Sequence, residues 1–191
     1  MTIPLLRSLV VLGILSVATS ALAADKTIDL GAGRAVIFDL TATLKMQTAE
    51  NPEGIDGKTI KIVARNGSNA ECNVTVLVDS EKRFADRDML KDLLTLSASS
   101  MVDQSVEGKV VAREFKTPHG SGFSATFTDK NLVGQPGVAG DYKSATFVIL
   151  SLPDQIGVIA TILADDPQGP EFKAMMALLR SLGVRTASSV I

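Results

Sequence analysis

The segment "KTPHGSGFSATFTDK", residues 116–130, contains the only histidine of the chain, His119, and a serine two residues later, Ser121. Nucleophilic catalysis needs a hydroxyl or thiol beside a base that a third group orients. The chain has no Gly-x-Ser-x-Gly elbow here, because in "HGSGF" the second glycine comes one residue too soon. Pro118 and Gly120 beside the histidine are typical of a turn. We therefore expect no catalytic residue, and we expect an exposed His119 on a turn that feeds a strand.

The residue types that bind metals do not form a recognisable motif. One histidine and one cysteine, His119 and Cys72, lie far apart in the sequence and cannot make a zinc site of nitrogen and sulfur ligands. Asp165 and Asp166 could supply oxygen ligands, but they precede a predicted helix and are expected to cap it in solvent. A second acidic set lacks the spacing of a calcium loop and is expected to be a solvated helix start. Its members are Asp79, Glu81, Asp86 and Asp88. No metal site is predicted.

Two glycine-rich segments could in principle bind phosphate, "GSG" at residues 120–122 and "GAGR" at residues 31–34. Neither has the remaining glycine of Gly-x-Gly-x-x-Gly, and neither opens a helix whose amides would bind the anion. Both are typical of turns or bulges next to strands, where glycine adopts a positive φ. We predict no cofactor.

The first 23 residues are typical of a secretory signal peptide. Arg7 is followed by an apolar run over residues 9–18, and the segment closes on Ala21-Leu22-Ala23, a pattern that signal peptidase cuts. The run is shorter than the roughly 20 residues of a membrane span. We predict cleavage after Ala23, a periplasmic or secreted location, and no stable membrane span in the mature protein, although an uncleaved N-terminal anchor is the alternative.

Composition limits the partners and the means of stabilisation. Without Arg7 the chain has 18 basic and 21 acidic residues, a net charge of −3, which argues against nucleic acid as a partner. A lone cysteine excludes an internal disulfide, so the remaining residues 24–191 must be stabilised by an aliphatic core of one domain. We expect Cys72 to be a small buried or half-buried side chain in a strand.

Hydrophobic periodicity predicts the elements. The segment 26–40 has short β-like runs broken by Gly31 and Gly33. The segments 58–65 and 72–79 alternate in the way of half-buried strands, and the turn residues between them indicate a hairpin. In the segment 81–106, six residues are at helical spacing, which predicts an amphipathic helix of about five turns that ends at Gly108. They are Leu90, Leu93, Leu94, Ala98, Met101 and Ser105. Strands follow near residues 109–117, 121–129, 142–152 and 155–165, with a hairpin turn at Pro153-Asp154. The last helix begins at Pro170 and should have Gly183 as its C-cap.

This order, strands then a long helix, then about four strands and a last helix, predicts an α+β fold. Its largely antiparallel sheet should be flanked by the long central helix and the C-terminal helix.

The second half also resembles a known group. "GSGFSATFTDK", "PGVAGDYKSATFVI" and "VIATILADDPQGPEFKAMMALLRSL" are similar, in this order, to segments of uncharacterised secreted bacterial proteins that resemble the PsbP-like and DcrB-like α/β/α sandwich superfamily. The resemblance covers roughly residues 80–185, and "FTDKNLVGQPGVAGDYK" is longer than the family turn. It implies a sandwich with a central antiparallel sheet in a single domain over residues 24–191. Members typically bind partner proteins or act as accessory factors, and the resemblance supplies no catalytic residue.

Three functional hypotheses follow. The first is a non-enzymatic accessory or binding protein of the bacterial envelope, which binds another envelope or secreted protein, or a ligand, on an open sheet face or in a cleft beside the long helix. The second is a small hydrolase or lyase that uses His119 with a hydroxyl or carboxylate partner. The third is a periplasmic carrier of an apolar ligand held between sheet and helix.

Overall fold

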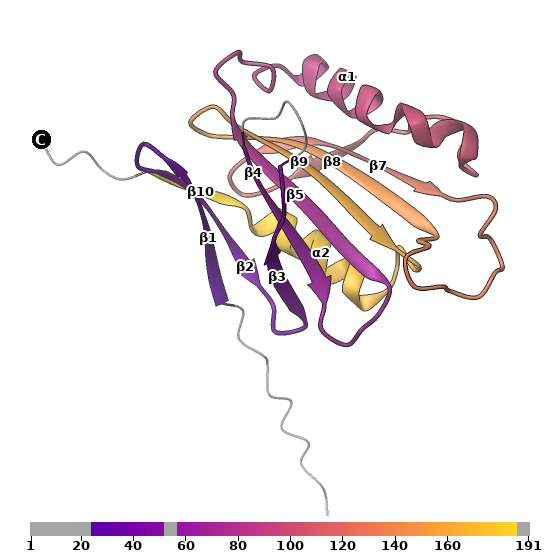
Figure 1. Cartoon of the computed structure of the whole chain (residues 1–191). Coiled ribbons are helices and arrows are strands. Elements are labelled where there is room, and N and C mark those ends of the chain that lie inside the picture. The colour runs from indigo at the N-terminus through magenta and orange to yellow at the C-terminus, as the bar shows by residue number, and fades with distance from the viewer. Residues whose placement is uncertain (1–23, 52–56, 187–191) are drawn as a thin grey trace, which may run out of the picture.

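The computed structural model describes residues 24–51 and 57–186 (Figure 1). Five strands come first: β1 (Ala24–Gly31), β2 (Arg34–Leu40), β3 (Leu44–Thr48), β4 (Gly57–Ala64) and β5 (Ala70–Val78). Helix α1 (Arg87–Ala98) and a 3₁₀ segment (Ser99–Gln104) follow. Four more strands are β6 (Arg113–Lys116), β7 (Ser121–Thr128), β8 (Ser144–Leu152) and β9 (Ile156–Ala164), and the described chain ends with α2 (Pro170–Ser181) and β10 (Gly183–Thr186). The expected signal peptide, with its cut after Ala23, lies outside the described residues.

A seven-stranded sheet forms the centre of the molecule, in the order β3-β4-β5-β9-β8-β7-β6. Every pair of neighbouring strands in it is antiparallel. The interior strands β8 and β9 are joined by a tight three-residue turn, residues 153–155, in which Asp154 and Gln155 both have positive φ. The predicted α+β class, with a largely antiparallel sheet between two helices, is confirmed.

The two faces of this sheet carry separate cores, because successive side chains of a strand point to opposite faces. On one face, side chains such as Val74, Val76 and Ile162 pack with Met175 and Leu179 of α2. On the other face, α1 covers β7 and β8. The core there includes Leu90, Leu94, Phe123, Phe127 and Ile149.

A second sheet of three strands, in the order β1-β2-β10, packs on the α2 side of the molecule. The short β-like runs expected on both sides of Gly31 and Gly33 pair as the β1–β2 hairpin, and its turn at residues 31–33 has positive φ throughout. Strand β10 was not expected. Gly183 was predicted as the C-cap of the last helix, which is wrong: α2 ends at Ser181, and Gly183 instead opens β10, which pairs with β2.

The long helix is shorter than the periodicity predicts. Asp86 is its N-cap and accepts hydrogen bonds from the N–H groups of Asp88 and Met89, so α1 cannot extend back to Glu81. At its C-terminal end the chain tightens into the 3₁₀ segment from Ser99. The strand expected from residue 109 is also shorter and begins only at Arg113.

The segment "GSG" was predicted as a turn that feeds a strand, and Ser121 indeed opens β7. The reason for its glycines differs from the expected positive φ, which neither adopts. A Cβ on Gly120 would lie 2.1 Å from the carbonyl oxygen of Ser151, and one on Gly122 would lie 1.9 Å from that of Ile149. Both glycines are needed because β7 approaches the backbone of β8 closely.

Candidate binding surfaces

A groove lies on the α1 side of the large sheet, where the helix begins and the strand ends are left uncovered. Its volume is about 380 Å³. Polar side chains of α1, the strands β6, β7 and β8, and the β6–β7 turn line this groove. Apolar side chains of α1, of the loop before it and of the strand ends complete the lining. The residues that matter here are Arg87, Glu114, Lys116, His119, Ser121 and Ser151, with Phe84, Leu90, Phe123 and Leu152 as apolar walls.

Three charged side chains meet at the rim of this groove. Glu114 accepts a hydrogen bond from Arg87 Nη2, and Lys116 Nζ lies 3.0 Å from Glu114 Oε2. The hydrogen bonds from Arg87 and then from Lys116 hold the pKa of Glu114 at about 2. The Arg87 guanidinium also lies over the Phe123 ring, 5.0 Å from its centroid, where a cation–π contact is favourable.

His119 is exposed on the β6–β7 turn, as the sequence predicts, and lines the same groove. Its backbone N–H donates to Thr117 Oγ1, and its ring lies against Gly183 of β10. Within the described part of the chain, no hydrogen bond joins its imidazole to Ser121, Ser151 or a carboxylate. The structure therefore brings His119 and two serines to one groove without the base–nucleophile contact that a dyad needs.

The acidic residues that were expected at a solvated helix start have different environments in the structure. Asp86 and Asp88 open α1, as expected, but Asp79 is wrongly placed among the solvated residues, because it is only 2% exposed. Its carboxylate accepts the N–H groups of Arg83 and Phe84 at 2.8 and 2.7 Å and shapes the loop before α1. Among residues 24–51 and 57–186, no three histidine, cysteine, aspartate or glutamate side chains are grouped to hold a metal ion.

The expected capping by Asp165 and Asp166 is also wrong. The N-cap of α2 is Gly169, and Asp165 Oδ1 instead accepts a hydrogen bond from Asn69. Asp166 Oδ1 accepts from the N–H of Gln168 within the turn before the helix.

Cys72 is fully buried in β5, as predicted, and burial raises the pKa of its thiol.

A second surface lies beside α1. The helix covers β7 and β8, whereas β4 and β5 lie beside it with no described helix above that face (Figure 1). Six half-buried side chains of β4, β5 and β9 face this uncovered area, and we call them the open strip. They are Lys61, Val63, Glu71, Asn73, Thr161 and Leu163.

The charged group of the open strip is held by a local network. Glu71 Oε2 lies 2.6 Å from Lys61 Nζ and accepts a hydrogen bond of 2.7 Å from the hydroxyl of Tyr142. Burial raises the pKa of Glu71, but the hydrogen bonds from Lys61, Tyr142 and Asn73 outweigh it and lower that pKa below its usual value. Burial, together with the bond to Glu71, raises the pKa of Tyr142 to about 12.

Exposed apolar side chains lie on one side of α1. Arg87 lies on the opposite side of the helix, toward the edge strand β6, where it meets Glu114. Helical spacing puts Met89, Leu93 and Leu96 away from Arg87, and we call these three the α1 apolar flank. Met89 is 42% exposed and Leu96 is 73% exposed.

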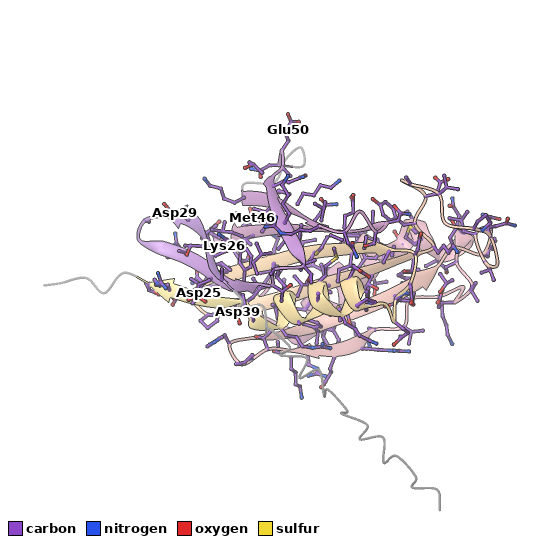
Figure 2. All side chains as sticks on the ribbon, turned by 90° about the horizontal axis from the view of Figure 1, so that it is seen from below. Asp25, Lys26, Asp29, Asp39, Met46 and Glu50 are labelled. Carbon is purple, nitrogen blue, oxygen red and sulfur yellow. The ribbon has the colours of Figure 1, made fainter. Side chains whose placement is uncertain are left out.

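The opposite end of the molecule is polar. Figure 2 labels Asp25, Lys26, Asp29 and Asp39 on the small sheet and Met46 on β3. Asp25 and Asp39 are directly opposite each other on β1 and β2, and both are exposed, so this face of the small sheet is solvated.

The sequence predicts an open sheet face or a cleft beside the long helix, but of the residues that line these surfaces only His119 and Ser121 were candidates. Glu71 and Tyr142 are separated by 71 positions, so no local pattern joins them. The alternation of polar and apolar residues in β4 was the available signal, since it marks a half-covered face.

No described helix is both long and apolar enough to cross a membrane. No protein-family model matches this chain, and no curated protein shows a similar sequence.

Proposed function

We propose that this protein is an exported, non-enzymatic accessory or binding protein of the bacterial envelope that binds a partner protein beside α1. The proposal includes the PsbP-like or DcrB-like resemblance of residues 80–185 and the signal-like segment before residue 24, both of which come from the sequence. The observation that carries it is the open strip, the part of this sheet face that α1 does not cover.

The dimensions of this surface suit one added element. Neighbouring strands are about 4.8 Å apart, so three uncovered strands give a strip roughly 10–14 Å wide. A helix with its side chains is about 10–12 Å across. Single exposed apolar side chains are common, but here two of them border a sheet face whose other half is already covered by a helix. A partner element beside α1 would complete the layer.

Site-specific photocrosslinking tests this proposal. A benzophenone side chain at Leu96 should give one main crosslinked species in envelope extract, and the same group at Lys91, on the opposite side of α1, should not. Unlabelled wild-type protein should compete for this species, whereas a Met89→Glu/Leu96→Glu variant with an unchanged circular dichroism spectrum should not. Equal patterns from both positions, or no competition, would contradict the proposal.

The His119 hydrolase is the second candidate, because His119, Ser121 and Ser151 line one groove. It predicts turnover of small ester substrates that His119→Ala abolishes, and that Ser121→Ala or Ser151→Ala also abolishes. Turnover that survives these substitutions would remove this candidate. The carrier hypothesis has no comparable observation in its favour, because the core between α2 and the large sheet is closely packed by fully buried side chains such as Val74, Ile162 and Leu179.

A further inference from the structure

The groove at the start of α1 has a charge balance unlike that of the chain as a whole. Arg87 and Lys116 share one carboxylate, that of Glu114, so this trio keeps one positive charge. The complete chain has a formal charge of −2. A ligand that brings one negative charge would make the trio neutral.

The contacts of Glu114 show which chemical group Arg87 and Lys116 bind. Glu114 is on an edge strand and faces the α1 side of the sheet, opposite Phe123 of β7. Its carboxylate accepts a hydrogen bond from Arg87 Nη2, and the Arg87 guanidinium carbon lies 5.0 Å from the centroid of the Phe123 ring. An arginine can bind a planar carboxylate through two parallel hydrogen bonds. In the free protein Glu114 therefore occupies the position that a ligand carboxylate would take.

The floor of the groove offers further polar groups. Ser121 and Ser151 are directly opposite each other on β7 and β8, and both line the groove. Neither hydroxyl has a hydrogen-bond partner within residues 24–51 and 57–186. Two solvated hydroxyls beside the cations can therefore bind the second oxygen of a carboxylate.

The remaining lining is apolar and limits the ligand. Phe84, Leu90, Phe123 and Leu152 lie beside the charged trio, and the groove volume of about 380 Å³ is near the lower end of ligand sites. Such a space suits a compact apolar body with a single acidic group.

We propose that this groove is a binding site for small carboxylates with an aromatic or aliphatic body, which Arg87 and Lys116 hold by displacing Glu114. This site is separate from the partner surface and does not depend on it, since the α1 apolar flank lies on the other side of the helix.

The test uses 3-phenylpropanoate as the probe and 3-phenylpropanamide as its uncharged counterpart, with ¹⁵N-resolved NMR titrations of the purified protein. The carboxylate should shift the amide signals of Ser121, Gly122 and Ser151, and the amide should bind at least about tenfold more weakly, since a charged hydrogen-bond pair contributes roughly that factor. Arg87→Gln should weaken binding by a similar factor.

Glu114→Gln makes the result specific to the displacement model. This substitution removes the competing carboxylate, so the probe should bind several-fold more tightly. Glu81→Gln, which changes the net charge equally but lies outside the groove, should leave the affinity unchanged. The proposal is wrong if the probe causes no shifts up to about 10 mM, a range that includes weak millimolar binding. It is also wrong if the amide binds equally well, or if Glu114→Gln weakens binding as Arg87→Gln does.

Discussion

Tyr142 is the only tyrosine of the chain, and the chain has no tryptophan, so its ionisation can be followed directly by ultraviolet absorbance. Its pKa is raised to about 12 by burial and by its hydrogen bond to Glu71. A tyrosine in an unfolded chain titrates near 10. We predict a tyrosinate midpoint near pH 12 for the folded protein and near pH 10 in denaturant.

The raised pKa of Tyr142 predicts how the stability of the protein changes with pH. Because the folded state holds the phenolic proton more tightly, this contribution is complete below about pH 10 and is lost as the pH rises toward 12. Tyr142→Phe should therefore flatten this part of the stability curve. Glu71→Gln should lower the folded midpoint, whereas Glu81→Gln should not. An unchanged midpoint in Glu71→Gln would show that burial alone sets the pKa.

Asp79 is the second residue whose role the structure defines. Its buried carboxylate accepts two backbone N–H groups of the loop before α1, so Asp79→Ala leaves buried donors without partners. We expect the free energy of unfolding to fall by about 2–4 kcal/mol in urea denaturation. The matched control is Asp88→Ala, an exposed residue in the first turn of α1, which should cost well under about 1 kcal/mol. Equal losses would refute a special role for Asp79.

At the level of elements, Phe84 links the loop before α1 to the large sheet. A Cβ at position 157 would lie 2.7 Å from atoms of the Phe84 ring, so the ring packs directly on the backbone of β9. Gly157→Ala should cost about 1–3 kcal/mol of unfolding free energy by overpacking. The same substitution should cost at least about 1 kcal/mol less in a Phe84→Ala background, because the collision is then absent. Additive losses in this double-mutant cycle would contradict the contact.

The sequence predicted the elements that have a strong period and missed those set by distant contacts. The alternation in β4 and β5 and the stripe of α2 were sufficient, because packing on one face imposes each period. The start of α1 was misplaced by several residues, because the periodicity continues through a loop that Asp79 and Asp86 shape by side-chain hydrogen bonds. Strand β10 has only four residues and is defined by pairing with β2, 146 to 152 positions earlier, which no local pattern can reveal.

The candidate surfaces were harder to predict than the fold. His119 and Ser121 attracted attention because their types are typical of catalysis, and the groove does contain both. Arg87 and Glu114 give the groove its charge. They belong to α1 and β6, and they come into contact only because α1 packs on the large sheet. An exposed ion pair has no sequence signature, since charged residues are common on any solvated face.

At the scale of the whole molecule, strand β10 joins the two ends of the described chain. It pairs with β2 from Gly183 to Thr186, so the hairpin that begins the described chain is tied to the segment that follows α2. Two contacts also connect β10 to the large sheet: Thr186 Oγ1 donates to Asp154 Oδ2 at 2.6 Å, and Gly183 lies against His119. The small sheet thus depends on β10 for one edge and part of its attachment.

A chain that ends at Leu182 tests this dependence. Without β10, β2 becomes an edge strand and its amides opposite residues 183–186 lose their partners. Hydrogen exchange should accelerate in β1 and β2 and stay slow in β5, β8 and β9, which are interior strands of the large sheet. Val184→Asp in the full chain should give the same pattern, because Val184 packs on the core, and Arg185→Ala should not. Equal acceleration in both sheets would instead show that they unfold as one cooperative unit, since local opening would then be no easier than global unfolding.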